Sequence, residues 1–322
     1  MEKVKWGVLG TADIARGQTI PGMMLAEHCE RYAIAGRRIE KAKAYQEEFG
    51  FQKAYGNYDE LLADPEVQAV YIPLPNDLHC EWAIKALKAK KHVLCEKPLA
   101  LSESQVKEMF RAAEENGVML MEAFAYLHSP FVKAVKAELD AGAIGEVRYF
   151  ESEFVTGRRP DTDIRLKKET GGGAFYDLGC YPLSMALWML GKEPDDVQAV
   201  AQFSEKQIDL FTSALLLYAN GPVAKIDCGM LLIPGRQDGL CIIGTEGRIV
   251  SPVEFNQCGE IPYTVERNGV KDTKTVCAPN NYALETEQLS RCILYGEQPH
   301  VSKEFSLLTA RVTDRILNAI GY

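Results

Sequence analysis

The sequence lacks the features of several protein classes. No apolar run approaches the ~18 residues of a membrane span, and the opening Met1–Gly10 lacks the apolar core and cleavage site of a signal peptide. The nine cysteines are scattered, without a Cys-x-x-Cys pair or clustering with histidine. Such a set is typical of reduced thiols and predicts neither a disulfide framework nor a zinc site. We therefore expect a cytoplasmic protein that does not associate with membranes.

The chain also has fewer positively charged than negatively charged residues. The chain has 36 Lys and Arg against 45 Asp and Glu, a formal net charge of −9 at pH 7. A chain of this sign repels a phosphate backbone, so we expect no nucleic-acid partner. Four of the five histidines, at 28, 92, 128 and 300, show no metal-ligand spacing. We therefore expect no metal site.

What is present indicates two globular domains. A chain of 322 residues is too long for one ordinary core, and its 47% hydrophobic content rules out wholesale disorder. Residues 1–125 alternate short apolar runs with helical patterns; the runs are 4–9, 31–35, 67–72, 92–95 and 118–121, and the helical patterns are 39–49, 79–89 and 102–116. This alternation predicts βαβ units in a doubly wound parallel sheet, the Rossmann architecture.

The pattern changes after residue 125. We expect helices at 130–141, 179–190, 283–295 and 303–320, and strands at 197–203, 211–218, 223–230, 240–243 and 248–250. Consecutive strands separated by Gly, Asn and Pro turns favour an antiparallel sheet. The predicted fold is thus α/β, with a Rossmann domain over 1–125 and an α+β domain with a mostly antiparallel sheet over 126–322.

A glycine turn follows the first predicted strand. Gly10-Thr11-Ala12-Asp13-Ile14-Ala15 matches the dinucleotide-binding pattern G-x-G-x-x-G/A, with alanine in its second position. Small residues there let the turn tighten and let backbone N–H groups reach a pyrophosphate at a helix N-terminus. The same letters also fit a tight strand-to-helix turn that binds nothing.

The end of the second predicted strand favours the nucleotide. NAD-binding sites usually place an acid there for the ribose hydroxyls, whereas this chain has Arg37 and Arg38 and no acid before Glu40. A guanidinium group suits a 2′-phosphate because it offers charge and a bidentate fork. The pattern predicts NADP(H) over NAD(H). The alternative is a solvated charge group with Glu40 and Lys41.

Three further segments complete a resemblance. Residues 71–79 (YIPLPNDLH) lie at the end of the predicted strand 67–72, 95–98 (CEKP) lie at the end of the predicted strand 92–95, and 171–182 (GGGAFYDLGCYP) lie early in the second domain. Over essentially the whole chain, these motifs resemble the Gfo/Idh/MocA oxidoreductase family. The opening WGVLGTADIA and Tyr181 are similar to the branch of dimeric dihydrodiol and NADP-dependent D-xylose dehydrogenases. Inositol dehydrogenases carry histidine in place of Tyr181.

The resemblance implies an NADP(H)-dependent enzyme that transfers a hydride between the nicotinamide and a secondary alcohol or carbonyl of a sugar or trans-dihydrodiol. It implies a homodimer or homotetramer formed through an open-faced C-terminal sheet, and it favours a cis Lys97–Pro98 bond. Glu96 is expected either at the nicotinamide ribose or paired with a lysine, and His79 either near the nicotinamide or in a structural role. The predicted cofactor-binding residues are Gly10, Thr11, Ala12, Asp13, Ile14, Arg37, Arg38, Leu74, Pro75, Asn76, His79, Glu96 and Lys97.

The expected chemistry needs an acid–base group. A tyrosine accepts a proton near neutral pH only if its pKa, normally ~10, is lowered, and a nearby ammonium does this. We expect Tyr181 to be the general acid/base, Lys97 to lower its pKa, and Asp177 to hold the substrate or Lys97. Arg165 is expected to line the substrate cleft or to be a surface arginine.

Each catalytic assignment has a structural alternative. Lys97 could be an exposed loop lysine, Asp177 the cap of the helix from 179, and Tyr181 a packing residue. Two other functions stay open: a non-catalytic NADP(H) sensor, disfavoured by an intact proton-transfer set, and a glycosidase-like relative that holds NAD tightly, disfavoured by Arg37 and Arg38.

Overall fold

The chain forms two compact units. The computed structural model describes residues 2–157, 160–232, 237–252 and 255–322. Unit 1 contains Met1–His128 and Asn280–Leu307, and unit 2 contains Ser129–Pro279 and Leu308–Tyr322. The expected division at 125/126 lies close to the first of these boundaries. It does not anticipate that residues 280–307 return to unit 1.

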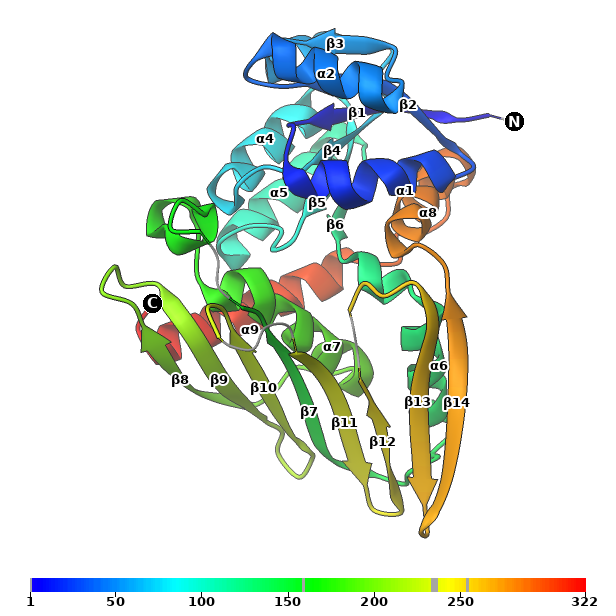
Figure 1. Cartoon of the computed structure of the whole chain (residues 1–322), viewed down its shortest axis with the longest axis vertical. Coiled ribbons are helices and arrows are strands. Elements are labelled where there is room, and N and C mark those ends of the chain that lie inside the picture. Colours follow the sequence, from blue (N-terminus) through cyan, green and yellow to red (C-terminus); the bar gives the residue numbers. More distant parts are fainter. Residues whose placement is uncertain (1, 158–159, 233–236, 253–254) are drawn as a thin grey trace. The chain divides into compact units, whose positions relative to one another are not determined.

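Unit 1 is built on a six-stranded parallel sheet in the order β3-β2-β1-β4-β5-β6, visible in Figure 1. Its strands are β1 (Val4–Leu9), β2 (Cys29–Ala35), β3 (Lys53–Tyr55), β4 (Ala69–Ile72), β5 (His92–Glu96) and β6 (Leu120–Ala123). The strand order reverses between β1 and β4, which pair in parallel with Val8 opposite Tyr71. This is the predicted doubly wound sheet.

Helices cover both faces of this sheet. They are α1 (Ile20–Leu25), α2 (Ile39–Phe49), α3 (Tyr58–Ala63), α4 (Asn76–Lys88), α5 (Glu103–Asn116) and α8 (Asn281–Tyr295), with short helical turns η1 (Ala15–Thr19) and η2 (Ala125–His128). Right-handed crossovers running in opposite directions from the switch point place α1 and α4 on opposite faces. Ser102, at the start of the predicted helical pattern 102–116, caps α5 by accepting the Gln105 N–H.

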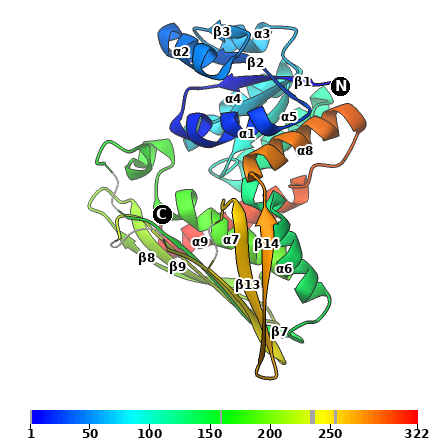
Figure 2. The ribbon, with the colours of Figure 1, turned by 45° about the vertical axis from the view of Figure 1, so that its right-hand side comes forward.

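Helix α8 lies beside α1 within unit 1, as both views show (Figures 1 and 2). Its Leu289 and Cys292 are fully buried, and the Trp6 indole of β1 donates to its Ser290 hydroxyl at 3.0 Å. The sequence predicted this helix but assigned it to the second domain. A helical pattern shows that a face is buried without showing which sheet buries it.

Unit 2 is built on an eight-stranded sheet in the order β14-β13-β12-β11-β7-β10-β9-β8, antiparallel except between β7 and β10. Its strands are β7 (Val147–Val155), β8 (Asp196–Phe203), β9 (Asp209–Leu217), β10 (Val223–Gly229), β11 (Gln237–Gly244), β12 (Gly247–Ser251), β13 (Gly259–Arg267) and β14 (Val270–Ala278). The five predicted strands are present. The sequence missed β7, β13 and β14 because polar residues dominate their exposed positions.

The helices of unit 2 are α6 (Pro130–Asp140) and α7 (Cys180–Leu190), with the turns η3 (Ile164–Leu166), η4 (Lys168–Thr170) and η5 (Phe175–Gly179). Helix α9 (Lys303–Ile320) contributes to both units. The π-helical turn η5 leads directly into α7, so this helical segment begins four residues before the expected start at 179. No helix in the described ranges combines the length and apolarity needed to cross a bilayer.

Candidate functional site

In unit 1, four predicted cofactor segments share one edge of the sheet. Gly10 follows β1, Arg37 follows β2 closely, Leu74 follows β4 and Lys97 follows β5. Because all these strands are parallel, their carboxyl ends meet at one edge, on both sides of the switch point between β1 and β4. Ligands of doubly wound sheets bind at this place.

The glycine turn after β1 is held by its surroundings. Gly10 adopts φ +137°, and a Cβ there would lie 3.2 Å from the Leu74 side chain, so the position favours glycine on both counts. The Thr11 carbonyl accepts from Lys41 Nζ at 3.0 Å and Tyr45 Oη at 3.2 Å. Ala12, Asp13 and Ile14 then lead into the π-helical turn η1 with their side chains partly or fully exposed. The turn therefore presents backbone and small side chains at a helix N-terminus.

Arg37 and Arg38 are both exposed after β2. Within the part of the chain that the structure describes, neither guanidinium makes an ion pair with Glu40 or with another carboxylate. Both side chains are therefore accessible to solvent and to a ligand. Two unneutralised guanidinium groups at this position fit a phosphate ester on the adenosine ribose.

His79 has a structural role. Its side chain is fully buried in α4, with Nε2 2.8 Å from the Leu74 carbonyl and Nδ1 2.9 Å from the Pro98 carbonyl. Burial lowers the pKa of this histidine, and a neutral ring has one N–H to donate to either carbonyl. His79 thus joins the segment containing Leu74, Pro75 and Asn76 to the segment containing Lys97, and it presents no ring nitrogen to a ligand.

Two buried acids, Glu122 and Glu96, lie in or beside the segment that contains Lys97. The Lys97–Pro98 bond is cis, as predicted. Glu122 of β6 accepts the Leu99 N–H at 2.9 Å, and burial raises the pKa of Glu122 to about 7. Glu96 accepts the Tyr71 hydroxyl at 2.5 Å, and Tyr71 in turn accepts the Thr19 hydroxyl at 2.9 Å. Glu96 is therefore anchored within the sheet by Tyr71, a partner that was not predicted.

Sequence reasoning missed a third acid in this region, Glu285 of α8. Its side chain is fully buried, and neither carboxyl oxygen has a hydrogen-bond partner among the described residues. Burial raises the pKa of Glu285 well above its usual value, and the nearby Glu96 raises it further. Burial and the neighbouring Glu96 therefore both favour the neutral form of Glu285.

In unit 2, Asp177 and Arg165 form an ion pair. Arg165 Nε lies 2.8 Å from Asp177 Oδ2, and Arg165 Nη1 lies 3.3 Å from Asp163 Oδ1. Asp177 lies inside the helical segment rather than before it, so it does not cap the helix. Arg165 is thus an ion-pair partner of Asp177 with a partly exposed side chain, and its expected place in the substrate cleft stays a prediction. Two carboxylates, those of Asp163 and Asp177, thus lie beside the Arg165 guanidinium.

Tyr181 lies four residues after Asp177, on the same face of the helical segment. Its ring contacts Phe154 and Phe255, with both pairs of ring centroids 5.2 Å apart, and its side chain remains partly exposed. Aromatic packing thus fixes the ring plane while leaving part of the residue accessible. The packing interpretation of Tyr181 and the catalytic one are compatible.

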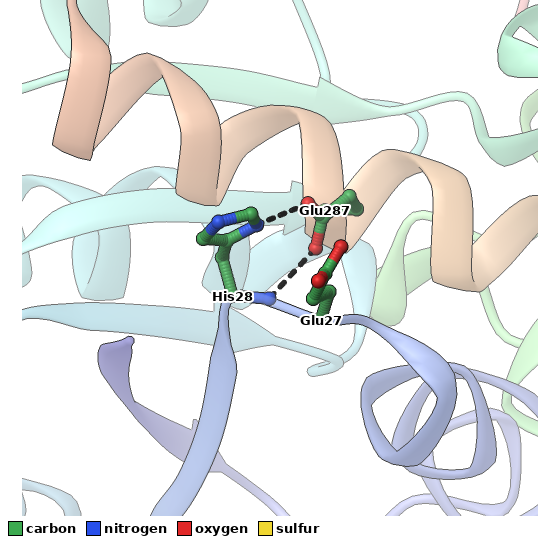
Figure 3. A group of neighbouring side chains, drawn as sticks. All are labelled: Glu27, His28 and Glu287. Carbon is green, nitrogen blue, oxygen red and sulfur yellow. Dashed lines mark hydrogen bonds and ion pairs between the residues drawn. The ribbon is translucent and has the colours of Figure 1, made fainter. Parts of the chain in front are cut away.

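One group of potential metal ligands occurs among the described residues. Ligand atoms of Glu27, His28 and Glu287 lie within 4.8 Å of one another (Figure 3). His28 Nδ1 faces Glu287 Oε1, however, and His28 Nε2 lies 2.9 Å from the Tyr295 hydroxyl. Both ring nitrogens are engaged within the fold. This group therefore fastens the start of β2 to α8.

Comparisons with known proteins cover both units. A family model described as "Oxidoreductase family, NAD-binding Rossmann fold" matches residues 4–124, and the GFO/IDH/MocA C-terminal domain model matches residues 132–250. D-xylose 1-dehydrogenase (NADP(+)) 2 of Haloferax volcanii is 37% identical over 97% of this chain and 95% of that protein. Trans-1,2-dihydrobenzene-1,2-diol dehydrogenase of Xenopus laevis is 32% identical over 98% of both chains.

The fold matches solved structures equally well. A crystal structure of a 3-ketoreductase from Actinomadura kijaniata, in complex with NADP and TDP-benzene, has a TM-score of 0.94 at 34% identity. The match covers 99% of this chain and 98% of the reductase. Together with the two domain matches, these full-length similarities confirm what the sequence motifs predicted: the chain belongs to the Gfo/Idh/MocA oxidoreductase family.

Proposed function

We propose that the protein is an NADP(H)-dependent oxidoreductase that acts on a secondary alcohol or carbonyl of a sugar or trans-dihydrodiol. The observation that carries the cofactor assignment is the exposed, unneutralised pair Arg37 and Arg38 after β2. The glycine turn and the small residues around it fit a pyrophosphate. The substrate class is supported by the xylose and dihydrodiol dehydrogenases to which the chain is similar.

The cofactor, when bound, exchanges a hydride with the substrate carbon. The chain must then take up or supply the proton of the substrate hydroxyl. Tyr181 is the proposed acid/base, since its ring is fixed and still partly exposed. The ammonium of Lys97 is the group proposed to lower its pKa. Asp177, which pairs with Arg165 at 2.8 Å, is the proposed acceptor for a substrate hydroxyl.

Two other functions compete with this one. A non-catalytic NADP(H) sensor needs the cofactor site but has no use for Lys97, Asp177 and Tyr181 together. A glycosidase-like relative that keeps NAD bound needs no contact for a 2′-phosphate, whereas Arg37 and Arg38 offer one. The presence of these five residues in one chain therefore favours the dehydrogenase over both alternatives.

The test has two stages. Titration with NADPH and NADH, followed by protein fluorescence, should show tighter binding of NADPH. A screen of neutral aldoses and diols with NADP⁺ should then give NADPH absorbance for at least one of them. Tight NADPH binding without turnover of any compound, in either direction, would support the sensor. Turnover of glycosides without net change in cofactor would support the glycosidase.

We further propose a cytoplasmic homo-oligomer. None of the nine cysteines, all of which the structure describes, takes part in a disulfide, and this is typical of a reducing compartment. The eight-stranded sheet carries half-exposed apolar side chains, including Leu215 and Leu217 of β9, on the positions that alternate with the buried ones. Light scattering should give a dimer or tetramer, and Leu215→Glu should shift it toward the monomer.

A further inference from the structure

A buried carboxylate lies beneath the glycine segment of unit 2, and no step of the proposed chemistry uses it. Asp209 begins β9 and is fully buried. Its Oδ2 accepts the backbone N–H of Phe175 at 2.8 Å and the hydroxyl of Thr212 at 2.8 Å. Phe175 is the first residue of the helical segment that carries Asp177 and Tyr181. Asp209 therefore supplies, from a strand 34 residues away in sequence, the acceptor that a helix start normally obtains from its own cap.

The glycine segment 171–173, which precedes this helix, is tightly packed. Gly173 adopts φ +114°, and a Cβ on it would lie 2.1 Å from Asp209 Oδ1. A Cβ on Gly172 would lie 2.5 Å from the carbonyl oxygens of Arg165 and Lys167. The backbone is thus enclosed between the Asp209 carboxylate on one side and the Arg165 loop on the other. Glycine is needed at these positions because the protein packs directly against their α-carbons.

Electrostatics acts on Asp209 in two opposite directions. The partial positive charge at the N-terminus of a helix favours an anion there. Burial outweighs the hydrogen bonds from Thr212 and Phe175, so the pKa of Asp209 is raised. Oδ2 has its two donors only in the observed position, and displacing this buried group from them is costly.

The enclosed segment leads directly to the proposed acid/base group. The Asp177 N–H donates to the Gly173 carbonyl at 3.2 Å, so the carboxylate that pairs with Arg165 moves with the glycine turn. Tyr181 follows one helical turn later. We propose that Asp209 is a positioning residue of the reaction: it fixes the start of this helix and thereby the places of Asp177 and Tyr181, without contacting the substrate. This inference rests on the proposed function for its effect on rate.

The test compares a substitution of Asp209 with a matched control substitution on the neighbouring strand. Asp209→Asn keeps the size of the side chain but removes the charge and replaces one acceptor oxygen with a donor amide. Asp196→Asn is the matched control, because Asp196 begins the neighbouring strand β8 and is exposed. Misplacement of reacting groups by about 1 Å can cost on the order of 10²-fold in rate. We expect Asp209→Asn to lower the single-turnover rate of hydride transfer by ~10- to 100-fold and to leave the NADPH dissociation constant within about threefold, since the cofactor residues belong to unit 1.

The amplitude of the single-turnover reaction distinguishes a positioning role of Asp209 from a role in folding alone. If Asp209 only supports folding, the variant should contain fewer competent molecules that react at the wild-type rate, so amplitude falls and rate does not. If Asp209 positions the site, the amplitude stays and the rate falls. A wild-type rate with wild-type amplitude in Asp209→Asn would overturn the proposal.

Hydrogen–deuterium exchange gives a readout that does not require turnover. In Asp209→Asn, amides of residues 171–181 should exchange at least tenfold faster, while those of β12 and β13 keep their wild-type rates. Unchanged exchange over 171–181 would refute the anchoring role even if the wild-type protein proved inactive. Inactivity of the wild type on all aldoses and diols would instead count against the proposed function alone.

Discussion

Arg37 decides which cofactor the protein prefers if the proposed function is correct. Loss of a charged hydrogen-bonded contact costs about 1.5–3 kcal/mol, or roughly tenfold to a hundredfold in affinity. Arg37→Ala should therefore weaken NADPH binding by this factor and leave NADH binding unchanged. Arg111→Ala is the matched control, because its exposed side chain lies on α5, away from β2. Fluorescence titration of both cofactors measures the effect, and equal weakening of NADPH and NADH would contradict the assignment.

Tyr181 and Lys97 are proposed to transfer the proton together. Tyr181→Phe keeps the ring that packs against Phe154 and Phe255 and removes only the hydroxyl. The loss of general acid–base catalysis should lower kcat by roughly 10²–10⁴-fold. Full activity of this variant would leave Tyr181 with a packing role only.

Lys97→Ala tests whether the two residues act as a unit. This variant should lower kcat severely and leave NADPH binding within a few fold. The double variant should be little worse than the worse single one, because groups that act together are not additive. Multiplicative losses in kcat would show that Lys97 and Tyr181 contribute independently.

At the scale of elements, the packing of α1 against α8 is the contact that brings residues 280–307 into unit 1. Gly22 lies at this contact, where a Cβ would approach the backbone of Tyr282 to 2.7 Å. Because backbone cannot yield as a flexible side chain does, Gly22→Ala should separate the helices and destabilise unit 1 by about 1–3 kcal/mol.

The adjacent turn η1 offers a matched control for this substitution. A Cβ at Gly17 would meet no atom within 4 Å, so Gly17→Ala should be neutral or slightly stabilising. Thermal unfolding in the absence of cofactor distinguishes the two variants. Equal melting temperatures for Gly22→Ala and Gly17→Ala would mean that α8 does not pack tightly on α1.

For the whole molecule, the buried acids make stability depend on pH. Glu122 has a pKa of about 7 in the folded state, above its usual value of 4.5, because burial favours the neutral acid. The folded state therefore retains a proton that the unfolded state has lost. The stabilisation is complete below about pH 4.5 and is lost as pH rises through about 7, a change on the order of 3 kcal/mol.

Glu122→Gln should remove this dependence, since an amide stays neutral and its oxygen still accepts the Leu99 N–H. The urea midpoint of the wild type should fall between pH 5 and pH 8, and that of the variant should fall less. Parallel curves for the two proteins would show that Glu122 does not titrate in this range. A glutamate exposed on the same unit, such as Glu115 of α5, gives the control substitution.

Local sequence patterns predicted most of the longer helices and many of the strands of this protein. Alternating apolar and helical segments predicted the parallel sheet, and the sequence motifs predicted the family and its proposed cofactor. These features depend on residues that are close in sequence. The alternation of a strand is visible over a few positions, and all residues of a glycine turn, of an arginine pair or of an N-cap such as Ser102 lie within one short segment.

From the sequence alone we could therefore predict which segments would carry the proposed chemistry, whereas the contacts that hold these segments in place depend on the tertiary structure. The partnership of Asp177 with Arg165, the burial of His79 between two loops and the anchor at Asp209 each join residues distant in sequence. The place of α8 in unit 1 has the same origin. A periodic pattern indicates that one face of an element is buried, and a buried polar group needs a hydrogen-bond partner. Neither shows which distant residue meets that need, because this depends on the tertiary packing and not on local sequence spacing.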